Sequence, residues 1–126
     1  MRTTGFIRSI SESMGFIRRA DIVAQYVADH PNSESMRPGE LYVVGNKHFQ
    51  KWALFQCPCG CGDTIMLSLS AKRRPSWTVC IDWLGRPSLS PSVRQIGGCY
   101  SHFWLKQGRL KWCADTGKRW HGRSHA

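Results

Sequence analysis

The feature that most constrains this chain is a run with three cysteines in five residues, Cys57-Pro58-Cys59-Gly60-Cys61-Gly62. The proline and the glycines prevent a regular strand or helix from continuing through it. Clustered thiols suit zinc, which sulfur and imidazole ligands bind tetrahedrally. A fourth ligand must come from elsewhere, and the downstream candidates are Cys80, Cys99, His102 and Cys113.

Length, charge and the N-terminus limit the class of protein. The 126 residues predict one domain, small enough that a bound metal would help to stabilise its core. No secretory signal and no apolar run of membrane-spanning length is visible, so we expect a cytoplasmic protein with free thiols and no membrane partner. A formal net charge of +10 and six tryptophans indicate an acidic partner, which is either nucleic acid or an acidic protein surface.

Alternation of apolar and polar residues predicts several short strands separated by turns rich in Gly and Pro. Between residues 16 and 28 the pattern fits a helical stripe and a strand equally. Further along, strands are expected at 41–44, before Gln56, and at 64–69, 77–82, 88–93, 103–105 and 110–112. We therefore expect a mainly β fold, a compact antiparallel sheet or a partly open barrel stapled by zinc, with at most one N-terminal helix.

The segment Ser88–Val93 is flanked by Pro87 and contains Pro91. Because proline cannot donate to a strand ladder, we expect this segment at an edge or rim of the sheet, where its side chains can face a ligand.

Four motifs together resemble one bacterial family: the cysteine run, Pro75-Ser76-Trp77, the segment 88–93, and Cys99-Tyr100-Ser101-His102-Phe103-Trp104-Leu105. That family was catalogued as a domain of unknown function. Its members occur in operons that encode ubiquitin-like proteins with activating and conjugating enzymes, and it is regarded as metal-binding and as a peptidase. The resemblance covers roughly residues 37–113. It implies a zinc-containing β domain there, an N-terminal extension at 1–36, and a basic tail at 114–126 that we expect to fray.

The resemblance also implies a ligand set for the metal. Cys57, Cys59, Cys61 and Cys99 match the cysteine positions of the family. Four thiolates make a closed site, and a closed zinc is structural. With His102 in place of one thiolate the site would be mixed, and a water as fourth ligand would make it catalytic.

If the zinc is structural, hydrolysis needs another nucleophile, and the resemblance implies Ser92, Ser101 and His102 as the polar residues of the active site. Ser101 and His102 are adjacent, so on a strand their side chains point to opposite faces. We therefore favour Ser92 with His102 as its base and keep Ser101 as second choice.

Further groups are expected to support this chemistry. Backbone N–H groups of Gly97 and Gly98 would stabilise an oxyanion, and Asp63 or Asp82 would orient the histidine.

The implied function is a serine-type hydrolase that processes or removes a ubiquitin-like protein by cleaving a peptide, isopeptide or ester bond. The flexible tail of that partner would add as a strand beside Ser88–Val93, and the activating or conjugating enzyme of the pathway would be a further partner. The alternative is a non-catalytic zinc module that binds nucleic acid through a basic face containing Lys72-Arg73-Arg74 and tryptophans.

Overall fold

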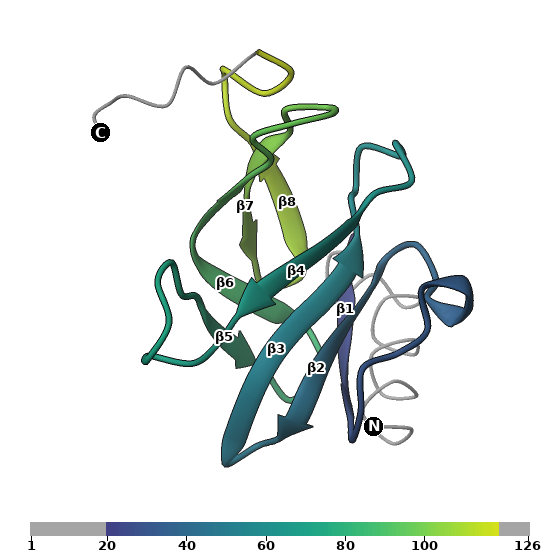
Figure 1. Ribbon diagram of the computed structural model, residues 1–126, viewed down its shortest axis with the longest axis vertical. Helices are drawn as coiled ribbons and strands as arrows, with labels where there is room; N and C mark the ends of the chain where they lie inside the picture. Colours follow the sequence, from purple (N-terminus) through teal and green to yellow (C-terminus); the bar gives the residue numbers. More distant parts are fainter. Residues whose placement is uncertain (1–19, 119–126) are drawn as a thin grey trace.

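The computed structural model describes residues 20–118, which form two four-stranded sheets. As Figure 1 shows, the first half of the described chain forms one sheet and the second half forms the other. The predicted mainly β fold is confirmed. Residues 1–19 of the predicted extension and 119–126 of the predicted tail lie outside the described residues. No helix within the described part has the length and apolar character needed to span a membrane.

The first sheet has the order β1-β2-β3-β4. Its strands are β1 (Val23–Val27), β2 (Glu40–Asn46), β3 (Phe49–Gln56) and β4 (Thr64–Ser68). The pairing of β1 with β2 is parallel, and the other two pairings are antiparallel. The segment that fitted helix and strand equally is a strand over Val23–Val27, and a single turn of 3-10 helix, η1 (Ser33–Ser35), lies in the connection to β2.

The second sheet is antiparallel with the order β5-β6-β7-β8. Its strands are β5 (Thr78–Ile81), β6 (Pro87–Arg94), β7 (His102–Lys106) and β8 (Arg109–Trp112). The predicted closing hairpin is β7–β8. Its two-residue turn, Gln107-Gly108, has φ of +48° and +75°, the left-handed backbone that such hairpin turns need.

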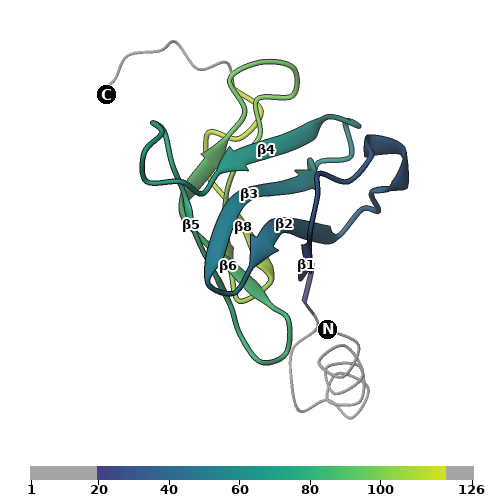
Figure 2. The ribbon, with the colours of Figure 1, turned by 60° about the horizontal axis from the view of Figure 1, so that its bottom comes forward.

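The inward faces of the two sheets share one core. Figure 2 shows the arrangement of the two sheets from a second direction. Phe55 on β3 and Phe103 on β7 meet edge to face at its centre, with 6.2 Å between ring centroids. Backbone bonds also join the sheets at both sides, from Ala24 N–H to Gly85 O and from Trp77 N–H to Ser68 O. Among the described residues the ladder does not close, so the architecture is a two-sheet sandwich close to the predicted partly open barrel.

The prediction that Ser88–Val93 lies at a sheet edge is wrong, because β6 lies between β5 and β7. The prolines are accommodated in another way. The pairing of β6 with β7 shifts between Leu89 and Val93, and the pairing with β5 ends at Ser90. Pro91 and Ser92 therefore have no register partner on either side, and the missing N–H of Pro91 interrupts no ladder.

Candidate active site and cysteine cluster

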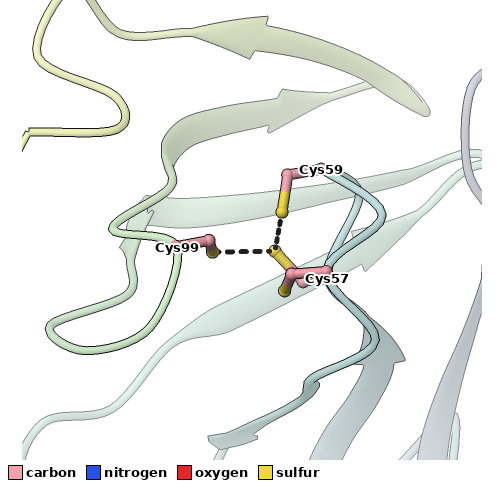
Figure 3. A group of neighbouring side chains, drawn as sticks. Cys57, Cys59 and Cys99 are labelled. Atoms are coloured by element: carbon pink, nitrogen blue, oxygen red, sulfur yellow. Dashed lines mark hydrogen bonds between the residues drawn. The ribbon is translucent and has the colours of Figure 1, made fainter.

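Four cysteines from two distant segments come together, three from the β3–β4 connection and one from the β6–β7 connection. The sulfur atoms of Cys57, Cys59, Cys61 and Cys99 all lie within 4.8 Å of one another. Cys57 Sγ is 3.5 Å from Cys59 Sγ and 3.6 Å from Cys99 Sγ (Figure 3). These separations are far longer than a disulfide bond of about 2.05 Å. The group could hold a metal ion, and it contains the four cysteines implied by the resemblance.

Burial and hydrogen bonds shift the pKa values of the cluster thiols in different directions. Burial raises the pKa of the Cys57 thiol to about 12. A hydrogen bond from Ser101, with smaller contributions from the neighbouring thiols, lowers the pKa of Cys59 to about 6. Since metal binding requires thiolates, a bound cation would offset the cost of ionising the buried sulfur.

Ser101 belongs to this cluster. It is 2% exposed, and its Oγ lies 3.1 Å from Cys99 Sγ and 3.6 Å from Cys57 Sγ. Between Cys99 and Ser101, Tyr100 has φ of +54°, an uncommon backbone for a residue other than glycine.

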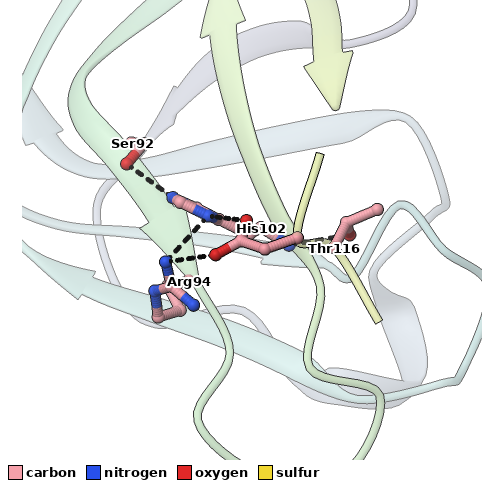
Figure 4. Close-up of polar contacts among 5 residues, drawn as sticks. Ser92, Arg94, His102 and Thr116 are labelled. Carbon is pink, nitrogen blue, oxygen red and sulfur yellow. Dashed lines mark hydrogen bonds and ion pairs between the residues drawn. The ribbon is translucent and has the colours of Figure 1, made fainter. Parts of the chain in front are cut away.

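Ser92, His102 and Asp115 form a second group. Figure 4 shows Ser92 and His102 of this group together with Arg94 and Thr116. Ser92 Oγ lies 3.0 Å from His102 Nε2, and His102 Nδ1 lies 2.7 Å from Asp115 Oδ1. Arg94 Nη2 donates to Asp115 Oδ2 at 2.8 Å and lies 3.0 Å from His102 Nδ1. A hydroxyl, an imidazole and a carboxylate connected in this order are the groups of a serine hydrolase triad.

The strands explain how Ser92, Arg94 and His102 meet. Arg94 on β6 and His102 on β7 are direct register partners. Ser92 lies two residues before Arg94, so both side chains leave the same face of β6, opposite to the buried Val93. The Trp77 indole donates to the Ser92 carbonyl at 3.2 Å and so fixes the backbone where the ladder is interrupted.

A turn after β8 supplies the carboxylate. Cys113 N–H donates to His102 O, His102 N–H donates to Thr116 Oγ1, and Gly117 N–H donates to Tyr100 O. These three bonds attach the turn to the start of β7 and hold Asp115 beside the imidazole.

The carboxyl group of Asp115 is ionised at neutral pH. The hydrogen bond with His102, followed by that with Arg94, lowers the pKa of Asp115 from 3.8 to about 2. The His102 side chain is 15% exposed and that of Asp115 is 44% exposed. The carboxylate can therefore hold the Nδ1–H tautomer of His102, which leaves Nε2 free to accept the Ser92 proton.

Other predicted residues lie apart from this group. Asp82 accepts hydrogen bonds from Arg86 Nε and from backbone N–H groups in the β5–β6 turn. Asp63 lies near Gly98, where an added Cβ would come within 3.0 Å of its carboxylate. Both aspartates expected to orient the histidine are thus placed elsewhere, and Cys80 is exposed on β5.

Asp115 was missed by the sequence reasoning because it follows the last strand, in a segment that was expected to fray. The available signal was local: Asp115-Thr116-Gly117 carries turn residues directly after β8. Cys113, a candidate metal ligand, lies in the same group as His102 and Asp115.

Comparison with known proteins assigns the chain to a family. A family model described as "Bacterial ubiquitination-like system serine protease (BubE)" matches residues 26–113. No curated protein and no solved structure matches. The matched range contains all the motifs that carried the resemblance, as well as Ser92 and His102. The chain therefore belongs to the BubE family of serine proteases of bacterial ubiquitination-like systems.

Proposed function

We propose that this chain is a serine hydrolase that cleaves the bond following the C-terminus of a ubiquitin-like protein. The observation that carries this proposal is the connected set Ser92 Oγ, His102 and Asp115, with contacts of 3.0 and 2.7 Å. The family description supports a protease in a ubiquitination-like system. The substrate would be a precursor or conjugate joined through a peptide, isopeptide or ester bond.

In the proposed reaction, Ser92 Oγ attacks the carbonyl carbon while His102 Nε2 takes the hydroxyl proton. The imidazolium is stabilised by Asp115 and then gives its proton to the leaving nitrogen or oxygen, which leaves an acyl ester on Ser92. A water molecule repeats the two proton transfers, releases the carboxylic acid and restores the serine. Ser92 and His102 are only partly buried, so substrate and water can reach them from solvent.

The tail of the ubiquitin-like protein would approach where β6 lacks partners. The sequence predicts that this tail adds as a strand beside the whole of Ser88–Val93. That is not possible, because β6 lies between β5 and β7. Pro91 and Ser92 lie beyond the end of the β5 pairing, so a short extended tail can reach Ser92 there. The activating and conjugating enzymes of the system stay predicted partners.

For the metal, we infer one structural zinc held by Cys57, Cys59, Cys61 and Cys99. Tetrahedral zinc with Zn–S distances of about 2.3 Å separates its sulfurs by about 3.8 Å. Cys57 Sγ lies 3.5 Å from Cys59 Sγ and 3.6 Å from Cys99 Sγ, close to that separation. Four thiolates leave no position for substrate or water, so the ion would supply cross-linking and no catalytic step. It would fasten the cysteine run to the segment that leads into His102.

The test compares Ser92→Ala with Ser101→Ala. The substrate is a fusion of a ubiquitin-like protein from the same system to a C-terminal reporter. We expect Ser92→Ala to lower kcat/KM by about 10³-fold or more without changing the melting temperature, since its hydroxyl is the nucleophile. Ser101→Ala should still cleave, but it should melt at a lower temperature because it loses buried contacts to sulfur.

A fluorophosphonate probe followed by peptide mapping gives an independent readout, with label expected on Ser92. Wild-type cleavage by folded Ser92→Ala would refute the serine mechanism and favour a metal-bound water as nucleophile.

A further inference from the structure

The outer face of the β7–β8 hairpin continues directly from His102. His102, Trp104 and Lys106 alternate with the buried Phe103 and Leu105, so their side chains leave the same face of β7. We name Trp104, Lys106 and Lys111 the β7–β8 strip. Lys111 belongs to it because it is the cross-strand partner of Trp104.

The strip combines an aromatic ring with two exposed ammonium groups. Lys106 Nζ lies 5.1 Å from the centroid of the Trp104 ring, and Lys111 is exposed on β8. A cation above an indole face is held in place without losing its charge. Asp115, the carboxylate beside His102, is engaged by Arg94 and His102 and so does not neutralise the strip.

The distance from the nucleophile suits a peptide substrate. Side chains two residues apart on one strand face are separated by about 6.6 Å, so Trp104 and Lys106 lie one and two such steps from His102. An extended peptide advances about 3.3 Å per residue. Residues about two to four positions from a bond at Ser92 would therefore lie over Trp104 and the two lysines.

We propose that the β7–β8 strip is a substrate subsite that binds acidic residues two to four positions from the scissile bond. Its occupant is a segment of the protein substrate that carries Asp or Glu, whose carboxylates pair with Lys106 and Lys111 while its backbone packs on Trp104. The subsite rests on the proposed function, because it takes the scissile bond to lie at Ser92. Charge complementarity and continuity with His102 select this occupant.

The experiment measures binding without hydrolysis, using full-length Ser92→Ala protein. The probes are fluorescein-labelled decapeptides of one sequence with three Glu, three Gln or three Lys at the same positions, together with a ten-residue oligothymidine. Fluorescence anisotropy gives each Kd at fixed salt. We expect the Glu peptide to bind roughly 2- to 30-fold more tightly than the Gln peptide, the range for two exposed ion pairs.

The strip variant is Lys106→Glu/Lys111→Glu, which should abolish or reverse the preference for Glu. The matched control is Lys47→Glu/Lys51→Glu, which makes the same change in net charge on exposed residues of the β2–β3 hairpin in the other sheet. The control should keep the preference, and melting temperatures of both variants should show that they are folded.

Three outcomes would overturn the proposal: no preference for Glu, a preference that survives in the strip variant, or equal loss in the control. Tighter binding of oligothymidine that is lost in the strip variant would assign the surface to nucleic acid instead. Because binding is measured on Ser92→Ala, a failed serine mechanism would leave this result unchanged, and the two failures remain distinguishable.

Discussion

Replacing Asp115 with asparagine should shift the neutral His102 ring toward the tautomer with hydrogen on Nε2, which cannot accept a proton from Ser92. In the structure, His102 Nδ1 lies between an acceptor, Asp115 Oδ1 at 2.7 Å, and a donor, Arg94 Nη2 at 3.0 Å. The carboxylate favours the form with hydrogen on Nδ1, and the guanidinium favours the form with hydrogen on Nε2. Only the first form can accept the Ser92 proton. After Asp115→Asn the ring loses its charged acceptor, and the arginine then selects the inactive form.

The exposure of Asp115 sets the size of the effect. In a triad with a fully buried aspartate, the same change lowers kcat by about 10⁴-fold. The Asp115 side chain is 44% exposed, so water partly screens its charge. In the variant, water can also take over part of its role as hydrogen-bond acceptor. We therefore expect a loss of about 10²- to 10³-fold in kcat with little change in KM. Adding Arg94→Met to Asp115→Asn removes the competing donor and should recover roughly three- to tenfold.

Steady-state cleavage of a reporter fusion gives the rates, and nitrogen-15 NMR of the His102 ring gives the tautomer. Arg94→Met alone should cost less than Asp115→Asn, because the carboxylate still holds Nδ1–H. The reasoning is refuted if Asp115→Asn keeps the Nδ1–H form and near wild-type turnover. It is also refuted if adding Arg94→Met lowers activity further.

Three other predictions follow from the same geometry. Chelation of the metal, or Cys99→Ser, should lower the melting temperature and release zinc measurable by atomic absorption; a protein that melts unchanged after complete chelation would contradict the structural role. His102→Ala should lose cleavage, while its zinc content and melting temperature stay close to those of the wild type. Loss of zinc from this variant would instead identify the histidine as a metal ligand. The pKa of Asp115 is depressed from 3.8 to about 2, so its contribution to stability is present above about pH 4 and is lost as the pH falls toward 2. Melting temperatures of wild type and Asp115→Asn should therefore converge over that interval, and a difference that persists at pH 2 would count against it.

Most strands were predictable because their signal is local. Alternation in 64–69 and 103–105 follows from one sheet face packing on the core and the other facing solvent, and the Gln107-Gly108 turn has its own residue signature. The pairing of Ser92 with His102 was also predictable, once their motifs were recognised, since adjacent residues on a strand diverge.

What the sequence could not supply is pairing between distant segments. The position of β6 inside its sheet depends on which strands flank it, and the prolines are compatible with an edge and with an interrupted central strand. The parallel pairing of β1 with β2 is equally non-local. Asp115 reaches His102 only because a turn folds back on β7, and no periodicity marks such a contact.

The alternation along β6 and β7 links the alignment of the proposed catalytic side chains, Ser92 and His102, to the packing of the core. Val93, between Ser92 and Arg94, is 2% exposed, and Phe103, next to His102, is fully buried. Each of the two proposed catalytic residues is thus the sequence neighbour of a core residue on the opposite face of its strand. A shift of the strand would move the core residue and its catalytic neighbour together. A one-residue slip would turn Ser92 inward while a sheet could still form. If the proposed function is right, substitutions that alter core packing along β6 or β7 should lower turnover before they prevent folding.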